Sequence, residues 1–180
     1  LLTRDQQDLH AWFLPTTGPS RGRVLYLHGN GENISTHIAS VYWLPSMGYE
    51  VLLLDYRGYG QSGGAPAVPD VLQDIDAAFD WLQAHSQADK PLMVYGQSLG
   101  AALAFQWLSL RQPPAVTAVV YDSVFHSYPA MVRKVLQESW LTWLFSYPVS
   151  FFFTGSNDPL RFAARQPAIP RLFIHSRDDA

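Results

Sequence analysis

The 180 residues are enough for one folded domain with a hydrophobic core, since 48% of them are hydrophobic and 15% are charged. The formal net charge of -3 comes with no basic stripe, which argues against a nucleic-acid partner. The chain has no cysteine, which excludes disulfides, thiolate metal sites and a cysteine nucleophile. We therefore expect a single domain over residues 1–180.

Segments with the character of strands alternate along the chain with segments of helical character. The expected strands are residues 8–14, 23–27, 50–54, 91–95, 115–121 and 171–174. Three helices are expected. The first spans residues 34–47 and is closed by Gly48, and the third spans residues 99–111. The second has Pro69 in its first turn, with Leu72, Ile75, Phe79 and Leu82 at helical spacing. This alternation predicts an α/β fold, a mostly parallel sheet with helices on both faces. Active sites in such sheets lie at the carboxyl ends of the strands.

The stretch 123–169 is longer than one crossover between two strands, and it is rich in aromatic residues. We interpret it as a cap or lid inserted into the domain. Its run 140–153 (WLTWLFSYPVSFFF) is interrupted by Pro148, so a single long helix is not expected there. Three roles stay open for this run: packing of the cap against the core, a lid over a lipophilic acyl group, and shallow insertion into a membrane surface.

The pattern G-x-S-x-G occurs at residues 96–100 (GQSLG), between an expected strand and an expected helix. This is the strand–turn–helix setting of a nucleophile elbow, in which a sharp turn exposes a serine hydroxyl. Glycines on both sides of Ser98 prevent clashes between neighbouring backbone segments. The start of the helix points free N–H groups and a positive dipole end at charge that develops on a substrate. Ser98 is therefore the candidate nucleophile, and a serine in an ordinary glycine-rich turn is the alternative.

Acyl transfer to a serine also needs two N–H donors for the tetrahedral oxyanion. Leu99, the residue after the nucleophile, supplies one of them, and the loop 28–33 after the strand 23–27 should supply the other. Gly29 and Gly31 allow this loop to turn its amides inward. We expect the backbone N–H of Asn30 to be the second donor.

Four motifs follow one another along the chain: LYLHGNGEN at 25–33, LLLDYRGYGQSGG at 52–64, YGQSLG at 95–100 and LFIHSRDD at 172–179. In this order they resemble the α/β-hydrolase-fold serine hydrolases, above all the branch of small esterases, lipases, acyl-thioesterases and related peptidases that share D-Y-R-G-x-G-x-S. The resemblance implies hydrolysis of an ester, thioester or related acyl bond through an acyl-enzyme on Ser98, with no metal or organic cofactor. It makes His28 a structural part of the oxyanion loop. Asp55, Tyr56 and Arg57 should organise their own loop.

In that family the catalytic triad runs serine, acid, histidine along the chain. The family pattern after the late strand 171–174 aligns the acid with Asp179, with Ser176 standing where glycine is usual. Asp178 is the neighbouring alternative. Asp122 is a second alternative, because some members of the fold place the acid after an earlier strand.

The histidine of the triad should follow the acid, and Ala180 is the last residue of this chain. We therefore expect the base to lie beyond residue 180, and the 180-residue polypeptide on its own to be nearly inactive. The histidines at positions 10, 37, 85, 126 and 175 are expected to be surface or packing residues. Both ends of the chain look like cut edges, so an upstream anchor or leader stays open.

The expected partner is a small acyl substrate, lipophilic if the lid covers an acyl group. A serine peptidase acting on small substrates is an alternative within the same chemistry. A non-catalytic binding protein on a hydrolase fold is an alternative of a different class. No segment of the sequence has the length of a membrane-spanning helix or the pattern of a signal peptide, and neither cellular location nor oligomeric state follows from it.

Overall fold

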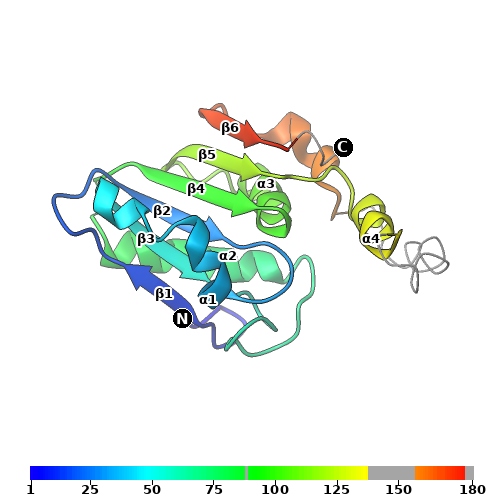
Figure 1. The fold of residues 1–180 in the computed structure, drawn as a ribbon, viewed down its shortest axis with the longest axis horizontal. Helices are drawn as coiled ribbons and strands as arrows, with labels where there is room; N and C mark the ends of the chain where they lie inside the picture. The colour runs from blue at the N-terminus through cyan, green and yellow to red at the C-terminus, as the bar shows by residue number, and fades with distance from the viewer. Residues whose placement is uncertain (88, 138–156, 177–180) are drawn as a thin grey trace.

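A parallel sheet with one antiparallel edge strand forms the centre of the computed structural model, which describes residues 1–87, 89–137 and 157–176. Its strands are β1 (Ala11–Leu14), β2 (Gly22–Leu27), β3 (Tyr49–Leu54), β4 (Leu92–Gln97), β5 (Val116–Asp122) and β6 (Arg171–Ile174). They lie in the order β1-β3-β2-β4-β5-β6, as Figure 1 shows, and only β1 runs antiparallel to its neighbour. The expected α/β fold is confirmed.

Helices cover both faces of this sheet. The α-helices are α1 (Ile34–His37), α2 (Val71–His85), α3 (Leu99–Arg111) and α4 (Tyr128–Gln137). The 3-10 helices are η1 (Ile38–Ser40), η2 (Leu44–Met47) and η5 (Pro159–Arg165). The helices α2 and α3 pack on one face, while α1, η1 and η2 pack on the other.

The alternating side chains of β2 enter two separate hydrophobic clusters. Leu25 and Leu27 pack against α2 and α3, whereas Val24 and Tyr26 pack against the α1–η2 layer. Successive side chains of a strand point to opposite faces, so a strand covered on both faces must be apolar throughout. Every residue of β2 is buried for this reason.

The helix expected at 34–47 is wrong as a single element. Asn33 caps α1 by accepting a hydrogen bond from the backbone N–H of Ser35, but α1 ends at His37 and 3-10 turns follow it. Pro45 has no N–H for an α-helical bond and lies in the first turn of η2, where a proline is tolerated. Gly48 ends η2 with a φ of 91°, as expected for a glycine at a helix end.

The start of the next helix also differs from the expectation. Pro69 lies two residues before α2, in a turn that leads into Val71, rather than in the first helical turn. The backbone N–H of Val71 donates to the carbonyl of Ala67, which closes that turn. All six strands and α3 lie where the sequence predicts them, with bounds that differ by three residues or fewer at each end.

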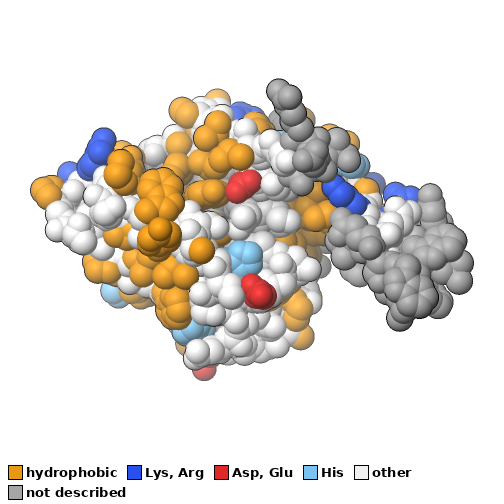
Figure 2. Space-filling view, viewed as in Figure 1, with side chains coloured by type: hydrophobic (Ala, Val, Ile, Leu, Met, Phe, Trp, Pro, Cys, Tyr) orange, Lys and Arg blue, Asp and Glu red, His pale blue; other side chains and the backbone are white. Residues whose placement is uncertain are grey.

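The α1–η2 layer is thin, and apolar side chains stay exposed beside it. Tyr42, Trp43 and Met47 are among the exposed large hydrophobic residues. Figure 2 shows apolar side chains gathered over the part of this face where η2 lies in Figure 1.

Two described elements, α4 and η5, fall within the stretch 123–169. The run 140–153 lies outside the described residues, so the lid interpretation and the three roles of that run stay predictions. No helix in the described part of the chain is long and apolar enough to span a membrane.

Candidate active site

Ser98 lies in the sharp turn between β4 and α3. Its backbone has φ 50° and ψ -109°, and a positive φ in a residue with a Cβ is strained. The turn is held on both sides: the N–H of Ser98 donates to the carbonyl of Asp122 at 2.8 Å, and its own carbonyl accepts from the N–H of Ala102 at 3.0 Å. Because the residue directly precedes the first helical turn, its side chain lies at the positive end of the α3 dipole.

Two glycines make this turn sterically feasible. A Cβ atom added to Gly100 would lie 2.0 Å from the carbonyl oxygen of Leu27 in β2. A Cβ atom added to Gly96 would lie 2.5 Å from the carbonyl oxygen of Gly100. The absence of both side chains lets the start of α3 approach the end of β2, which brings the loop after β2 next to Ser98.

The expected oxyanion loop runs alongside the serine. A Cβ atom added to Gly29 would lie 3.6 Å from Cβ of Ser98. Asn30, Ser98 and Leu99 line one cavity of about 520 Å³. The three residues that the sequence assigns to the nucleophile and to the two donors are therefore neighbours, and this arrangement suits a carbonyl carbon held at the Ser98 hydroxyl.

His28 is completely buried behind this loop. Its ring packs against His37 and Tyr56, with ring centroids 5.2 Å and 4.5 Å away. Nδ1 lies 2.7 Å from the carbonyl oxygen of Gly29, which can only accept, so Nδ1 carries a proton. Burial lowers the pKa of His28. A buried ring with these contacts has no access to a substrate, which agrees with the structural role implied by the family resemblance.

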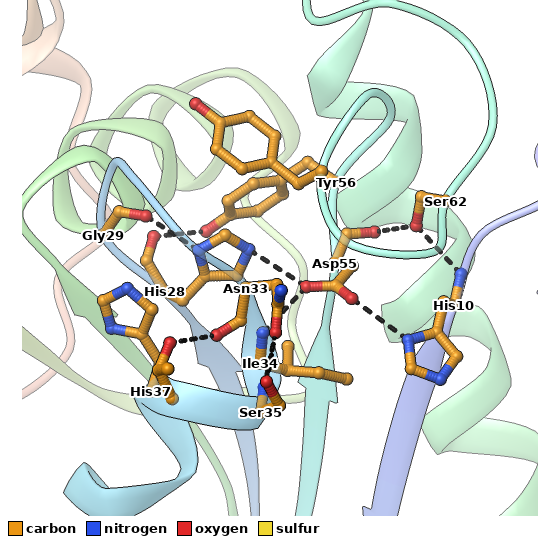
Figure 3. A network of polar contacts seen from close by, with 12 residues as sticks. His10, His28, Gly29, Asn33, Ile34, Ser35, His37, Asp55, Tyr56 and Ser62 are labelled. Carbon is orange, nitrogen blue, oxygen red and sulfur yellow. Dashed lines mark hydrogen bonds and ion pairs between the residues drawn. The ribbon is translucent and has the colours of Figure 1, made fainter.

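Asp55, at the end of β3, is a buried centre of polar contacts, shown in Figure 3. Its carboxylate accepts from the backbone N–H of Ile34 at 2.9 Å and lies 3.0 Å from Nδ1 of His10. Nε2 of His28 lies 3.6 Å away and has no hydrogen-bond partner among the described residues, because the proton of the neutral ring is on Nδ1 and Nε2 presents a lone pair to the carboxylate. The backbone of His10 is also bonded to the loop after β3: its N–H donates to the hydroxyl of Ser62, and its carbonyl accepts from the N–H of Asp55.

Arg57 forms a second buried polar group. Its guanidinium donates to Asp74 of α2 at 2.7 and 2.9 Å, and its backbone N–H donates to the same carboxylate at 2.8 Å. It also donates to Asp5 at 2.8 and 3.2 Å. These contacts hold the loop after β3 in place, the role expected for this motif.

Of the three candidate acids, Asp122 is the one that the structure describes. Its carboxylate accepts from the hydroxyls of Tyr95 at 3.3 Å and Ser123 at 3.2 Å. Burial, together with the charge of Asp122, raises the pKa of Tyr95 to about 12, so that hydroxyl stays a donor. Asp178 and Asp179 lie outside the described residues, and their assignment stays a prediction.

Two histidines lie near the serine. His126 and His175 line a cavity of about 480 Å³ together with Ser98 and Ser123. Nε2 of His175 lies 3.1 Å from the carbonyl oxygen of Val124. Among residues 1–87, 89–137 and 157–176, no side chain is hydrogen-bonded to the Ser98 hydroxyl, and no cluster of three or more histidine, aspartate or glutamate side chains suits a metal ion.

Sequence reasoning missed the residues that shape the space around Ser98. Met131, Val132 and Leu136 of α4 line the 520 Å³ cavity, and Tyr59 donates a hydrogen bond to Oδ1 of Asn30 at 2.8 Å. The apolar spacing 132–136 along α4 is a signal that could have identified one face of that helix. Nothing in the sequence indicates the contact of Tyr59, which joins residues 29 positions apart.

The sequence of this chain matches one family model and several related proteins. The family model described as "Serine aminopeptidase, S33" matches residues 18–179. The Escherichia coli K12 protein YfhR is 30% identical over 98% of this chain and 60% of its own length. The "Lysophosphatidylserine lipase ABHD12" of Macaca fascicularis is 30% identical over 93% of this chain and 44% of its own. The chain thus spans 60% or less of the length of these two relatives.

Among solved structures, the Pyrococcus furiosus esterase Pf2001 is similar, with a TM-score of 0.73 and 25% identity. The match covers 96% of this chain and 65% of the esterase. The ferulic-acid-bound Est1E from Butyrivibrio proteoclasticus has a TM-score of 0.68 at 18% identity, covering 95% of this chain and 76% of that protein, and it supports the fold alone.

Proposed function

This chain belongs to the α/β-hydrolase family described as serine aminopeptidase S33, and on that premise we propose that it hydrolyses an ester, thioester or related acyl bond through an acyl-enzyme on Ser98. Its esterase and lipase relatives support hydrolase activity. The observation that carries the serine mechanism is the strained turn of Ser98 at the start of α3, beside the loop 28–33. Strain persists where the surrounding structure enforces it, and such sites are frequently functional.

In the proposed reaction the hydroxyl oxygen of Ser98 attacks the substrate carbonyl. A histidine base takes the hydroxyl proton and gives it to the leaving group as the bond to that group breaks. The N–H groups of Leu99 and Asn30 donate to the oxyanion of the tetrahedral intermediate, and each such donor is worth roughly 10²–10³ in kcat. Water then attacks the acyl-enzyme by the same steps, which releases the acid and restores the serine.

The proposed reaction also needs an acid and a histidine base. We assign the acid to Asp179 on the family resemblance, with Asp178 and Asp122 as alternatives. Asp122 has a structural argument of its own, because its backbone carbonyl accepts from the N–H of Ser98. The histidine is the one expected from the order of the triad, after the acid in the chain.

The proposed acyl group is lipophilic. Besides Asn30 and Ser98, the 520 Å³ cavity is lined by Leu99, Phe125, Met131, Val132 and Leu136. Apolar side chains of this kind bind hydrocarbon, because burial stabilises about 0.8 kcal/mol per CH₂ group. The lipase relative named above fits the same class of substrate.

The same lining favours an ester or thioester over the substrate of an aminopeptidase. A free α-amino group is a cation, and burying it beside the reacting bond is costly unless a carboxylate pairs with its charge. The described residues that line the 520 Å³ cavity include no aspartate or glutamate. We therefore rank acyl hydrolysis above peptidase activity.

The test uses a fluorophosphonate probe and p-nitrophenyl esters on the natural full-length protein. We expect the probe to label the wild type and not Ser98→Ala, and ester hydrolysis to fall at least 10³-fold in that variant, as roughly expected for loss of a nucleophile. Labelling or hydrolysis that survives Ser98→Ala would show that another residue is the nucleophile. A folded wild type that neither reacts with the probe nor hydrolyses esters would favour a binding protein.

A further inference from the structure

The loop 28–33, which carries the proposed donor Asn30, is buried at its start and exposed in its middle. His28 is fully buried, whereas Asn30 is exposed. Gly31 follows with a φ of 77°, and a Cβ atom there would meet nothing within 4 Å. An exposed segment with a glycine and few packing contacts changes conformation readily. An oxyanion hole, however, requires donors that are aimed before the reaction begins, so contacts from outside the loop must hold it.

The carboxylate of Asp55 holds the end of this loop and lies beside the buried ring of His28 at its start. As Figure 3 shows, it contacts the backbone N–H of Ile34, just past the end of the loop, and the ring of His28 at its start. The Asp55 side chain is 1% exposed. A Cβ atom on Gly60 would lie 2.1 Å from its Oδ2, so the loop after β3 folds directly over the carboxylate. A buried carboxylate with several fixed partners is a rigid reference for the groups it contacts.

Tyr59, four residues after Asp55, holds the exposed middle of the loop. Its hydroxyl donates to Oδ1 of Asn30 at 2.8 Å. Burial raises the pKa of Tyr59, so the hydroxyl keeps the proton that it donates. Tyr56, between the two, donates to the carbonyl oxygen of His28 at 2.9 Å. One short segment therefore contacts the oxyanion loop at its start, its middle and its end.

We propose that Asp55 and Tyr59 are positioning residues of the acyl transfer: together they hold the backbone N–H of Asn30 in the direction that the oxyanion requires. This inference rests on the proposed function, because it assigns a role in the reaction at Ser98. Tyr59 acts through the side chain of Asn30, and Asp55 acts through the backbone N–H of Ile34 at the end of the loop.

If these contacts are removed and the N–H of Asn30 is misdirected, the chemical step should become slower while the affinity for substrate changes little. The strength of a hydrogen bond falls steeply with angle and distance, so an N–H that is misdirected by a few tenths of an ångström stabilises the oxyanion less. The ground-state substrate has no full negative charge on that oxygen. Binding of the substrate therefore depends much less than the transition state on where the N–H of Asn30 points.

The test compares Tyr59→Phe with Tyr42→Phe in the natural full-length protein. Each change removes one phenolic hydroxyl, and Tyr42 is 66% exposed on the α1–η2 layer. We expect Tyr59→Phe to lower kcat for p-nitrophenyl butyrate about tenfold with little change in KM, and Tyr42→Phe to change neither. The Ki of phenylboronic acid, whose adduct with the serine is tetrahedral and anionic, should rise about tenfold in Tyr59→Phe, as expected for a contact to the oxyanion.

A second variant, Asp55→Asn, keeps an oxygen that can accept from Ile34 but removes the charge beside His10 and His28. We expect it to lower kcat as well, and to lower the melting temperature. If it does not fold, Tyr59→Phe decides, because loss of one partly buried hydroxyl leaves the core intact.

Unchanged kcat and boronate Ki in a folded Tyr59→Phe would overturn the inference, and so would a loss confined to KM. Failure of the proposed function gives a different pattern: hydrolysis would then survive Ser98→Ala, whatever Tyr59→Phe does. The two ideas can therefore fail separately.

Discussion

Two regions near Ser98 differ in character: the loops 28–33 and 55–60, which we call the oxyanion side, and α4 with Phe125, which we call the acyl side. The oxyanion side consists of backbone in close contact with backbone and of buried polar groups, such as the carboxylate of Asp55. The acyl side consists of partly exposed apolar side chains. The first arrangement tolerates few substitutions, because close backbone contacts leave no room for added atoms and a buried polar group that loses its partner is costly. The second can change its side chains and keep the fold, so we expect it to set substrate preference.

The largest effect on stability is expected at Asp74, whose carboxylate accepts hydrogen bonds from Arg57 and so holds the loop after β3. Asp74→Ala leaves a buried guanidinium with Asp5 as its remaining partner, and breaking such a pair costs about 3–5 kcal/mol. Urea denaturation measures the loss. Asp80→Ala is the control, because Asp80 and Arg4 form an exposed pair 3.9 Å apart, and it should cost about 0–1 kcal/mol. Equal losses in the two variants would contradict the comparison.

A smaller loss is expected where α3 approaches β2. Gly100→Ala adds a methyl group that would lie 2.0 Å from the carbonyl oxygen of Leu27, so the helix must shift, at a cost of about 1–3 kcal/mol. The shift also moves Ser98 and Leu99 relative to the oxyanion loop, and fluorophosphonate labelling should slow. Gly18→Ala, at a position with nothing within 4 Å, should leave both measurements unchanged. Full labelling of a stable Gly100→Ala protein would show that the elbow tolerates this change.

The oxyanion side should also make stability depend on pH. Burial lowers the pKa of His28 in the folded protein below its usual 6.5. At pH values below 6.5 the unfolded chain therefore binds a proton that the folded chain does not, and stability falls as pH decreases from 6.5 towards the lowered pKa. Urea midpoints at pH 7.5 and 5.5 should differ less in His28→Asn than in the wild type. The same substitution at the exposed His85 is the control, and an equal reduction there would count against this explanation.

The smallest effect on stability, and the largest on substrate choice, is expected on the acyl side. Met131→Ala removes part of the lining of the 520 Å³ cavity. The ratio of kcat/KM for p-nitrophenyl octanoate over acetate should fall about tenfold, while stability changes by about 1 kcal/mol or less. Met47→Ala, on the exposed surface of η2, should leave the ratio unchanged. A parallel loss for both esters would mean that Met131 supports the fold rather than the acyl group.

The parts of the molecule that follow local rules could be predicted from the sequence. The bounds of α3 and β6 agree with the prediction, because each is an apolar segment with a proline beside it: Pro113 lies just past the end of α3 and Pro170 directly precedes β6. Ser98 and its turn were identifiable because the two glycines are needed where the backbone segments meet. Helical spacing alone does not reveal that α1 ends at His37, and Pro45 explains only why the later turn in η2 is not α-helical.

The long-range polar contacts could not be predicted. His10 reaches Asp55 across 45 positions because β1 pairs with β3, and strand order is not encoded in any short pattern. The contact of Tyr59 with Asn30 depends in the same way on how two loops meet. The candidate acids Asp178 and Asp179 lie outside the described residues, so their assignment still depends on the family resemblance.

The contact of His10 with the loop after β3 has a consequence for how this protein is handled. His10 directly precedes the edge strand β1, and it is joined by side chain and backbone to Asp55 and to the loop after β3 that contacts the oxyanion loop. Fraying that edge, by an insertion or a proteolytic cut just before β1, should slow turnover before the bulk of the fold melts. Activity would then report on the integrity of the β1 edge of the sheet more sensitively than circular dichroism does.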